Sequence, residues 1–376
     1  MTPRERMIIA MRNGAPDRVP VAPDTSNMIP CRLTGKPFLD IYLYQDPPLW
    51  QAYIECVRHF GFDGWLPGVP ITFDWQMPPP GAPVPREAIV HRTPDRIITR
   101  HHWTEDGHER WSPNCTVYYI ADPPTGNVPP AKIGLSADSP RDYEDVTPRT
   151  HYPGVSAFLA AREMMGDNGV VAPAVGLPGL GLDAESQYQW ADDPASVLER
   201  CERDHAWLVR YAQSALELRP DFLLIGISGH MIANPEPIFR KLSLPTLQAI
   251  TRLCKDADVP SQIHCCGPER SLVRIAAEES DLTSINPLEI PPMGDCNLAE
   301  IKRLYGSRLS LMGNLHTTDV ILRGTPDTVR EASRQAIEDA AEGGGFILST
   351  GDQCGRDTPD ENIRAMMEAA SEFGVY

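Results

Sequence analysis

The chain has 376 residues, of which 41% are hydrophobic, and carries 51 acidic against 34 basic side chains, a formal net charge of −17 at pH 7. This length supports one barrel-sized domain or two smaller ones, and the acidic balance argues against nucleic acid or an anionic membrane as the partner. No signal peptide follows Met1 and no apolar run is long enough to span a bilayer, so the sequence predicts a cytoplasmic protein whose nine cysteines are reduced thiols.

Eight short apolar runs are predicted to form buried strands, and amphipathic segments lie between the later runs. In chain order the runs are residues 19–22, 63–66, 170–175, 222–226, 261–264, 282–285, 309–312 and 346–348. Helices are expected to start where a small or capping residue precedes a proline, at Asp193-Pro194, Gly267-Pro268, Thr325-Pro326 and Thr358-Pro359. Strands that alternate with helices in this way predict a parallel (β/α)₈ TIM barrel, with a doubly wound open sheet as the alternative.

Residues 67–150 interrupt the alternation. They are rich in proline and contain an expected hairpin that turns at Asp106-Gly107, between Arg96–Arg100 and Glu109–Trp111. We interpret this segment as an insertion after the second strand. The prediction is therefore one barrel domain over residues 1–376 with an insertion at about 67–150.

Three soft metal ligands follow predicted strands. His264 and Cys266 have H-x-C spacing at the end of the fifth strand, and Cys354 follows the eighth. In a barrel the carboxyl ends of the strands converge on one face, so these residues would become neighbours. A catalytic zinc ion takes three protein ligands and keeps one open position. Cys265 would point to the other side of its strand from Cys266, so we expect only one of the two to bind.

Other polar residues follow strands on the same predicted face. Glu289 follows the sixth strand, whereas Asn314 and His316 follow the seventh. We name these three as candidate catalytic residues. A structural or solvated role is the competing interpretation for each, because polar side chains in loops are common.

An ordered set of segments resembles the uroporphyrinogen decarboxylase superfamily, and within it the zinc-containing, corrinoid-dependent methyltransferases. The resemblance covers nearly the whole chain. The segments that carry it are Thr2–Arg6 with Pro16–Val21, Asn234–Lys241, Gly313–Leu315, Gly324–Asp327 and Asp357–Ile363. It implies a (β/α)₈ barrel in which the H-x-C-G motif and a late cysteine hold zinc, here His264, Cys266 and Cys354. It also implies a carboxylate that fills the fourth position until substrate displaces it, for which Glu289 is the nearest match.

The resemblance further implies an activity and a partner. We expect a methyltransferase that moves a methyl group from a small methylated donor to a cobalt(I) corrinoid (cobalamin) carried by a partner protein. A methoxylated aromatic donor is favoured, since aromatic residues in and near the insertion could wall a pocket: Trp65, Phe73, Trp75, Trp103 and Trp111. Filling a core is the competing interpretation of each aromatic residue. A homodimer would be unsurprising.

Three alternatives remain. The first is the second half-reaction, from methylcobalamin to a thiol or folate acceptor, which the same ligands would serve. The second is a cofactor-free decarboxylase like the namesake of the superfamily, but residues 23–30 lack the arginines that such enzymes use to hold carboxylates. The third is a structural zinc site, which usually has four ligands at short spacing. His316 and Gly229-His230 depart from the superfamily pattern, in which acidic residues are more usual.

Overall fold

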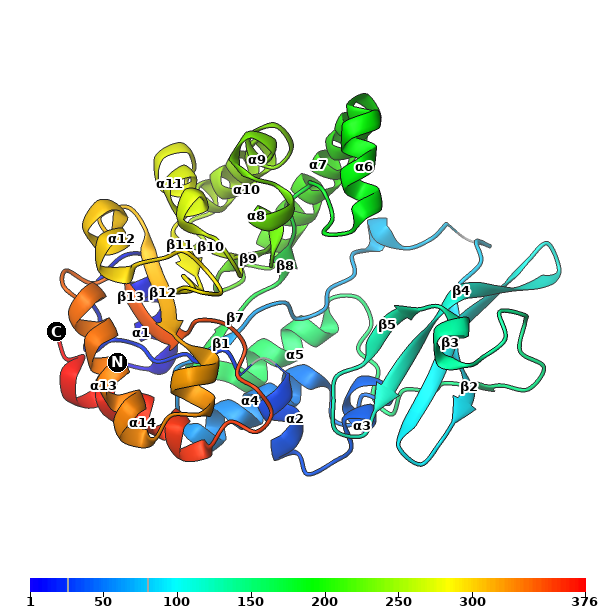
Figure 1. The fold of residues 1–376 in the computed structure, drawn as a ribbon, viewed down its shortest axis with the longest axis horizontal. Helices are drawn as coiled ribbons and strands as arrows, with labels where there is room; N and C mark the ends of the chain where they lie inside the picture. The colour runs from blue at the N-terminus through cyan, green and yellow to red at the C-terminus, as the bar shows by residue number, and fades with distance from the viewer. Residues whose placement is uncertain (26, 80) are drawn as a thin grey trace. The chain divides into compact units, whose positions relative to one another are not determined.

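The computed structural model describes residues 1–25, 27–79 and 81–376 (Figure 1). The chain forms two compact units. Unit 1 contains Met1–Asp24, Val57–Pro70 and Phe158–Tyr376, and unit 2 contains Thr25–Cys56 and Ile71–Ala157. Unit 2 thus includes most of the predicted insertion together with a segment that precedes the second predicted strand. None of the helices in the described ranges is both long and apolar enough to cross a membrane.

Unit 1 is built on parallel strands. Six of them form one sheet in the order β13-β12-β11-β10-β9-β8, and β1 pairs with β7 in a separate two-stranded sheet. Their bounds are β1 Gly64–Leu66, β7 Gly169–Val171, β8 Ala174–Val175, β9 Leu223–Gly226, β10 Ser261–His264, β11 Ser284–Asn286, β12 Ser310–Leu315 and β13 Phe346–Thr350. The sequence therefore predicted the parallel strands and the mixed α/β class correctly.

The regular strands do not close into one continuous eight-stranded sheet, which corrects the prediction of a complete barrel. The predicted first strand, residues 19–22, makes only an isolated parallel bridge, between Val21 and Leu348. Pro20 has no N–H to donate to a ladder. Its carbonyl still accepts from Leu348 N at 2.9 Å, and Asp63 N donates to the carbonyl of Val21 at 2.8 Å. The predicted strand 170–175 is divided into β7 and β8 at Ala172-Pro173.

The helices of unit 1 alternate with these strands from β9 onward. Their bounds are α1 Pro3–Met11, α6 Ala184–Asp192, α7 Pro194–Glu217, α8 His230–Ala233, α9 Glu236–Leu242, α10 Leu244–Asp256, α11 Arg270–Glu279, α12 Leu298–Tyr305, α13 Pro326–Ala340 and α14 Asp360–Phe373, with η3 Gly166–Asn168 and η4 Thr317–Leu322. Asp193 and Thr325 cap α7 and α13, as predicted, through bonds from Ser196 N and Thr328 N. In contrast, α11 begins at Arg270 and α14 at Asp360, neither with a side-chain cap.

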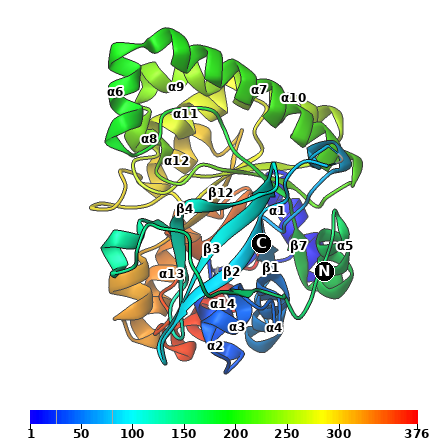
Figure 2. The ribbon, with the colours of Figure 1, turned by 90° about the vertical axis from the view of Figure 1, so that its right-hand side faces the viewer.

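Helix α1 lies beside β7 (Figure 2). Its buried side chains Met7, Ala10 and Met11 belong to the same apolar cluster as residues of the strands. Those residues are Ala22, Trp65, Val170, Ala172, Phe222, Leu224, Met312 and Ile347. Burial of this apolar cluster stabilises unit 1, because it removes apolar surface from water.

Unit 2 is an antiparallel sheet with short helices. The strands are β2 Arg86–Arg92, β3 Arg96–Glu105, β4 His108–Tyr119, β5 Thr125–Val128 and β6 Glu144–Asp145, in the order β5-β4-β3-β2-β6. The helical segments are α2 Met28–Leu33, α3 Phe38–Tyr42, η1 Asp74–Gln76 and η2 Pro130–Ile133; α4 Leu49–Phe60 and α5 Ser156–Met165 run from one unit into the other. Glu105 pairs with His108 across Asp106-Gly107, which both have positive φ, so the turn lies where the sequence predicts it.

Candidate metal centre

His264, Cys266 and Asp352 come together after β10 and β13. His264 Nε2 lies 3.3 Å from Cys266 Sγ and 3.9 Å from Asp352 Oδ1. One ligand atom from each residue lies within 4.8 Å of the others. Imidazole, thiolate and carboxylate are all zinc ligands, so the types of donor atom fit a zinc ion.

Asp352 Oδ1 gives an independent indication of a cation. This oxygen is buried and has no hydrogen-bond partner among the described residues. A buried carboxylate oxygen without a hydrogen-bond donor is costly, although 33% of the Asp352 side chain remains exposed and limits this cost. A metal ion between Asp352, His264 and Cys266 would remove that cost.

The Cys266 thiol is held protonated by its surroundings. Burial, together with the nearby Asp352 and Glu289 carboxylates, raises its pKa to about 12, although a hydrogen bond with Ser228 opposes the shift. A bound dication would reverse this balance, since a coordinated thiol is deprotonated. The site therefore favours a thiolate only when a cation is bound.

Cys354 lies in the same segment as Asp352 but outside the group of three. It is buried, and its backbone N donates to the carbonyl of Asp24 at 2.8 Å. Thr350 Oγ1 accepts from Asp24 N at 3.0 Å and donates to the carbonyl of Asp352 at 2.7 Å. These bonds hold residues 350–354 against Asp24 and determine where both possible ligands lie.

Glu289 lies close to this group of three residues, and its carboxylate already accepts a hydrogen bond. Its Oε2 accepts from Gly267 N at 2.5 Å, and burial raises the pKa of the carboxyl. The charges of Asp352, His264 and His316 also act on this pKa, so Glu289 is electrostatically coupled to the centre. It does not belong to the group of three donor atoms.

Asn314 and His316 bind backbone atoms. Asn314 Nδ2 donates to the carbonyl of Leu288 at 3.1 Å. His316 Nδ1 accepts from the N–H groups of Thr318 and Asp319, at 3.2 and 3.0 Å, and thereby caps η4. Both side chains thus position the loops that follow β11 and β12.

Cys265 is fully buried and lies outside the donor group, as the alternation along a strand predicts. Burial raises the pKa of its thiol well above the usual range. This thiol therefore behaves as a packed apolar group.

Two residues beside the centre were not identified as functional from the sequence. Asp352 stands two positions before Cys354, so a search for carboxylates beside the candidate thiol would have found it. Asn286 ends β11 as His264 ends β10, and the two residues are paired in register. Its Nδ2 lies 3.2 Å from His264 Nδ1.

The aromatic residues named from the sequence lie in both units. Trp65 is buried in unit 1, where its Nε1 donates to Gln262 Oε1 at 2.7 Å and its ring centroid lies 6.3 Å from that of His264. In unit 2, Phe73 stacks on Trp75 and Trp111 stacks on the buried ring of His102. An aromatic substrate pocket formed by these residues stays a prediction.

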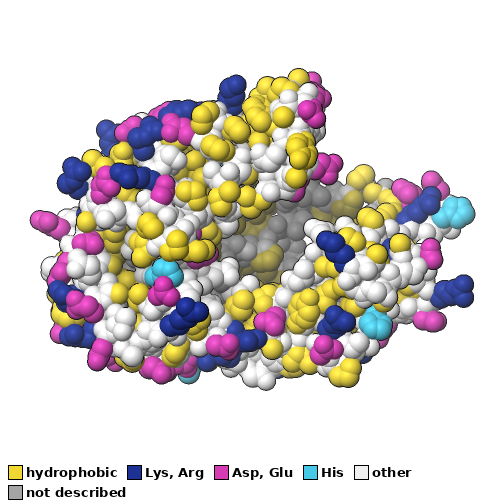
Figure 3. All heavy atoms as spheres, viewed as in Figure 1, with side chains coloured by type: hydrophobic (Ala, Val, Ile, Leu, Met, Phe, Trp, Pro, Cys, Tyr) yellow, Lys and Arg dark blue, Asp and Glu magenta, His cyan; other side chains and the backbone are white. Residues whose placement is uncertain are grey.

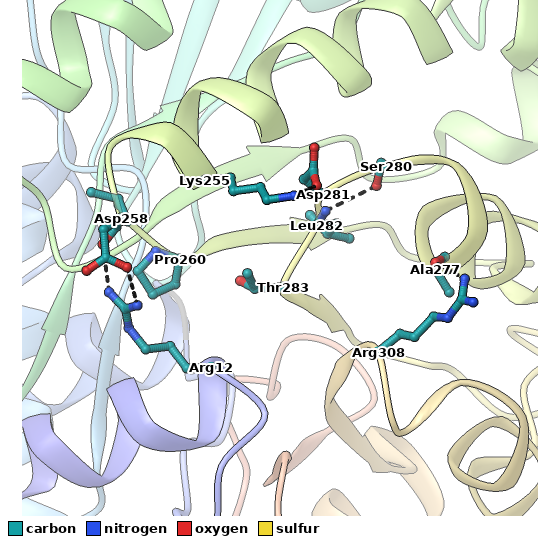
Figure 4. A pocket seen from close by; sticks show the side chains of 11 residues that line it. Arg12, Lys255, Asp258, Pro260, Ala277, Ser280, Asp281, Leu282, Thr283 and Arg308 are labelled. Atoms are coloured by element: carbon teal, nitrogen blue, oxygen red, sulfur yellow. Dashed lines mark hydrogen bonds and ion pairs between the residues drawn. The ribbon is translucent and has the colours of Figure 1, made fainter.

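A separate hollow of about 470 Å³ lies at the amino-terminal ends of the strands (Figure 4). Its basic side chains are already engaged: Arg12 binds Asp258 and Lys255 binds Asp281, each at 2.6 Å, and Arg308 donates to the carbonyl of Ala277. Basic and acidic side chains are likewise interspersed on the face drawn in Figure 3. The basic side chains around the hollow are therefore already paired, so the hollow is a poor binding site for an anion.

Comparison with known proteins shows which proteins parts of this chain resemble. Residues 188–373 match the family model of uroporphyrinogen decarboxylase. The methylcobamide:CoM methyltransferase MtbA of Methanosarcina mazei is 29% identical over 169 residues, which are 44% of this chain and 46% of that protein. For MtaA of Methanosarcina barkeri the identity is 24% over 238 residues, 61% of this chain and 66% of that protein. The match thus spans about half the length of the first of these relatives.

A solved structure supports the fold. A methyltransferase from Methanosarcina mazei covers 99% of this chain and 99% of its own, with a TM-score of 0.63 and 16% identity. This chain therefore shares its α/β fold with that protein, and the ends of β10 and β13 lie at the candidate centre. The matched part of the chain is thus similar to uroporphyrinogen decarboxylase and to the corrinoid methyltransferases MtbA and MtaA.

Proposed function

We propose that this protein is a zinc-dependent methyltransferase that exchanges a methyl group between a small substrate and a corrinoid carried by a partner protein. The names of the relatives support corrinoid-dependent methyl transfer. The observation that carries the proposal is the convergence of His264, Cys266 and the unpaired Asp352 Oδ1 after β10 and β13.

The proposed ligands are His264, Cys266 and Cys354, with a carboxylate in the fourth position. Asp352 is favoured for that position, because its Oδ1 is unpaired and lies 3.9 Å from His264 Nε2. Glu289, the carboxylate suggested by the resemblance, instead accepts a hydrogen bond from Gly267 N. A carboxylate is more readily displaced than a thiolate, so the substrate would enter at this position.

Each ligand has a role that its surroundings support. When bound, zinc acts as a Lewis acid that stabilises a thiolate or an alkoxide next to the reacting methyl group. Cys266 must release its proton to the solvent for binding, against the burial that keeps it protonated. His264 binds as a neutral imidazole through Nε2. Glu289, close to the centre and with a raised carboxyl pKa, is suited to hold or accept a proton from an incoming thiol or alcohol.

The donor is proposed to be a methoxylated aromatic compound, which makes the protein an O-demethylase component. The second half-reaction is the alternative, and a specific observation favours it: the relatives are named as methyltransferases between a methylcobamide and the thiol CoM. The same ligands serve both directions, because each requires an oxygen or sulfur atom held next to the methyl carbon.

Metal content tests the site. We expect about one zinc ion per purified chain and a large loss in Cys266→Ser and Cys354→Ser. Cys254→Ser is the control, because Cys254 is buried like Cys354 and lies in α10. A carefully purified wild-type protein free of zinc, or equal loss in the control, would contradict the proposed centre.

Spectroscopy tests the direction. Cob(I)alamin is mixed with the protein and a panel of aryl methyl ethers, and formation of methylcobalamin is followed by absorbance. In the reverse assay, methylcobalamin is offered with small thiols. Methylation of thiols without demethylation of any ether would assign the protein to the second half-reaction, and activity in neither assay would contradict methyl transfer.

A further inference from the structure

His264 is contacted by a buried amide that has one satisfied end and one unsatisfied end. Asn286 is 1% exposed, and its Nδ2 lies 3.2 Å from His264 Nδ1. Its Oδ1 is buried and has no hydrogen-bond partner in the part of the chain that is described. Buried amide oxygens are normally paired, so this arrangement requires a physical reason.

A hydrogen bond from Asn286 Nδ2 to His264 Nδ1 would select one tautomer of His264. An amide N–H can bond to Nδ1 only if Nδ1 accepts, and a neutral imidazole then carries its proton on Nε2. This Nε2 faces Cys266 Sγ at 3.3 Å and Asp352 Oδ1 at 3.9 Å. A protonated Nε2 cannot bind a metal, so this tautomer is incompatible with a metal ion at Nε2.

Turning the amide reverses the selection. The two ends of a side-chain amide have nearly the same shape, and a half-turn about the Cβ–Cγ bond exchanges them. The unpaired Oδ1 would then accept from Nδ1–H, and the lone pair of Nε2 would face Cys266 and Asp352. Metal-binding histidines typically donate their other ring N–H to an oxygen in this way.

We propose that Asn286 is a positioning residue for the metal centre, whose amide bonds to either tautomer of His264 and presents Nε2 to the metal in one of them. The inference rests on the proposed metal centre. The proton balance is simple: one proton leaves Nε2 and one arrives at Nδ1 through the solvent, so the imidazole stays neutral. The protons released on metal binding would come from the Cys266 and Cys354 thiols, the two proposed thiolate ligands.

The backbone makes Asn286 well placed for this role. His264 and Asn286 are directly paired in register between β10 and β11, and Cys265 N donates to the carbonyl of Asn286 at 2.9 Å. The amide therefore stands on a strand and not on a loop, so its distance from the imidazole is held by the sheet.

Two substitutions and a control test the inference through zinc affinity, measured by competition with a chromogenic chelator. Asn286→Leu keeps the size but loses the acceptor, and we expect zinc affinity to fall about 10–100-fold. Asn286→Asp supplies only an acceptor, so affinity should stay within a few-fold of the wild type or rise. Asn362→Leu is the control, because Asn362 is also 1% exposed with an unpaired Oδ1 and donates to the carbonyls of Ile321 and Gly324.

Nitrogen-15 NMR of the wild-type imidazole provides a second measurement that does not depend on an Asn286 variant. The His264 signal, assigned by comparison with His264→Gln, should change from Nε2–H without metal to Nδ1–H with zinc. Unchanged zinc affinity in Asn286→Leu, or Nε2–H retained with zinc bound, would overturn the inference while leaving the metal centre intact. A wild-type protein that binds no zinc would overturn the metal centre and this inference together.

Discussion

Replacing Asp63 by asparagine should destabilise unit 1 strongly. Asp63 is fully buried and stands just before β1. Its Oδ1 binds Arg6 Nη1 at 2.5 Å, whereas its Oδ2 binds Arg18 Nη1 at 2.8 Å and accepts from Val21 N at 2.9 Å. One carboxylate thus connects α1, residues 18–21 and the start of β1.

The expected magnitude follows from these three contacts. In Asp63→Asn the amide oxygen can keep both Arg18 and Val21 N as donors, but the new NH₂ group then faces Arg6, which also only donates. Removing one partner of a buried ion pair typically costs about 3–5 kcal/mol. At about 2 °C per kcal/mol for a chain of this size, the melting temperature should fall by roughly 6–10 °C.

Asp17→Asn is the matched control, because Asp17 binds the same arginine, at 2.7 Å, from an exposed position. The hydrogen bond from Arg6 lowers the pKa of Asp17, but with 41% of its side chain exposed the pair is screened and should be worth at most about 1 kcal/mol. Urea unfolding and calorimetry give the comparison. A loss below about 1 kcal/mol in Asp63→Asn, or equal losses in both variants, would refute the argument from burial.

Further predictions concern the metal centre and pH. Asp352→Asn should lower zinc affinity at least about tenfold with little loss of stability in the metal-free protein, because Oδ1 has no hydrogen-bond partner among the described residues and a third of the side chain is exposed; chelator competition and urea unfolding separate the two effects. Zinc at a hundred times its dissociation constant should stabilise the wild type by about 2.7 kcal/mol, and Cys266→Ser should lose this effect in thermal unfolding. Burial lowers the pKa of His230 to about 4. Because an unfolded histidine takes up a proton near pH 6.5, the free energy of unfolding should have its full value above that pH and should be lower by on the order of 3 kcal/mol at pH 4. His230→Gln should flatten this decline in a series of urea titrations, and an unchanged decline would assign it to other groups.

The parallel strands could be predicted because their signals are local. An apolar run such as Ser261–His264 is short and continuous, as expected of a strand buried on both faces. Helix starts were predictable where a side chain caps the backbone directly, as Asp193 does for α7. Helix α14 begins at Asp360 without a hydrogen bond from a capping side chain, so Thr358-Pro359 indicated the start of this helix although no side chain caps it.

The breaks in the sheet were harder to predict. Pro20 and Pro173 lie within apolar runs, and their missing N–H groups divide or weaken the ladders there. The apolar pattern outweighed this signal in the prediction. Similarly, Thr25–Cys56 is helical at α2 and α3 and resembles the rest of an α/β chain, but it belongs with unit 2.

The sequence by itself determined the parallel α/β class and the adjacency of His264 and Cys266, since strand pattern and H-x-C spacing depend on neighbours in the chain. Only the tertiary structure brought Asp352 to that pair and placed Asn286 behind the imidazole. The reason is physical: these contacts depend on the register of β10 with β11 and on the bonds that hold residues 350–354 against Asp24. Register and loop path are set by the packing of the whole unit, which no short stretch of sequence contains.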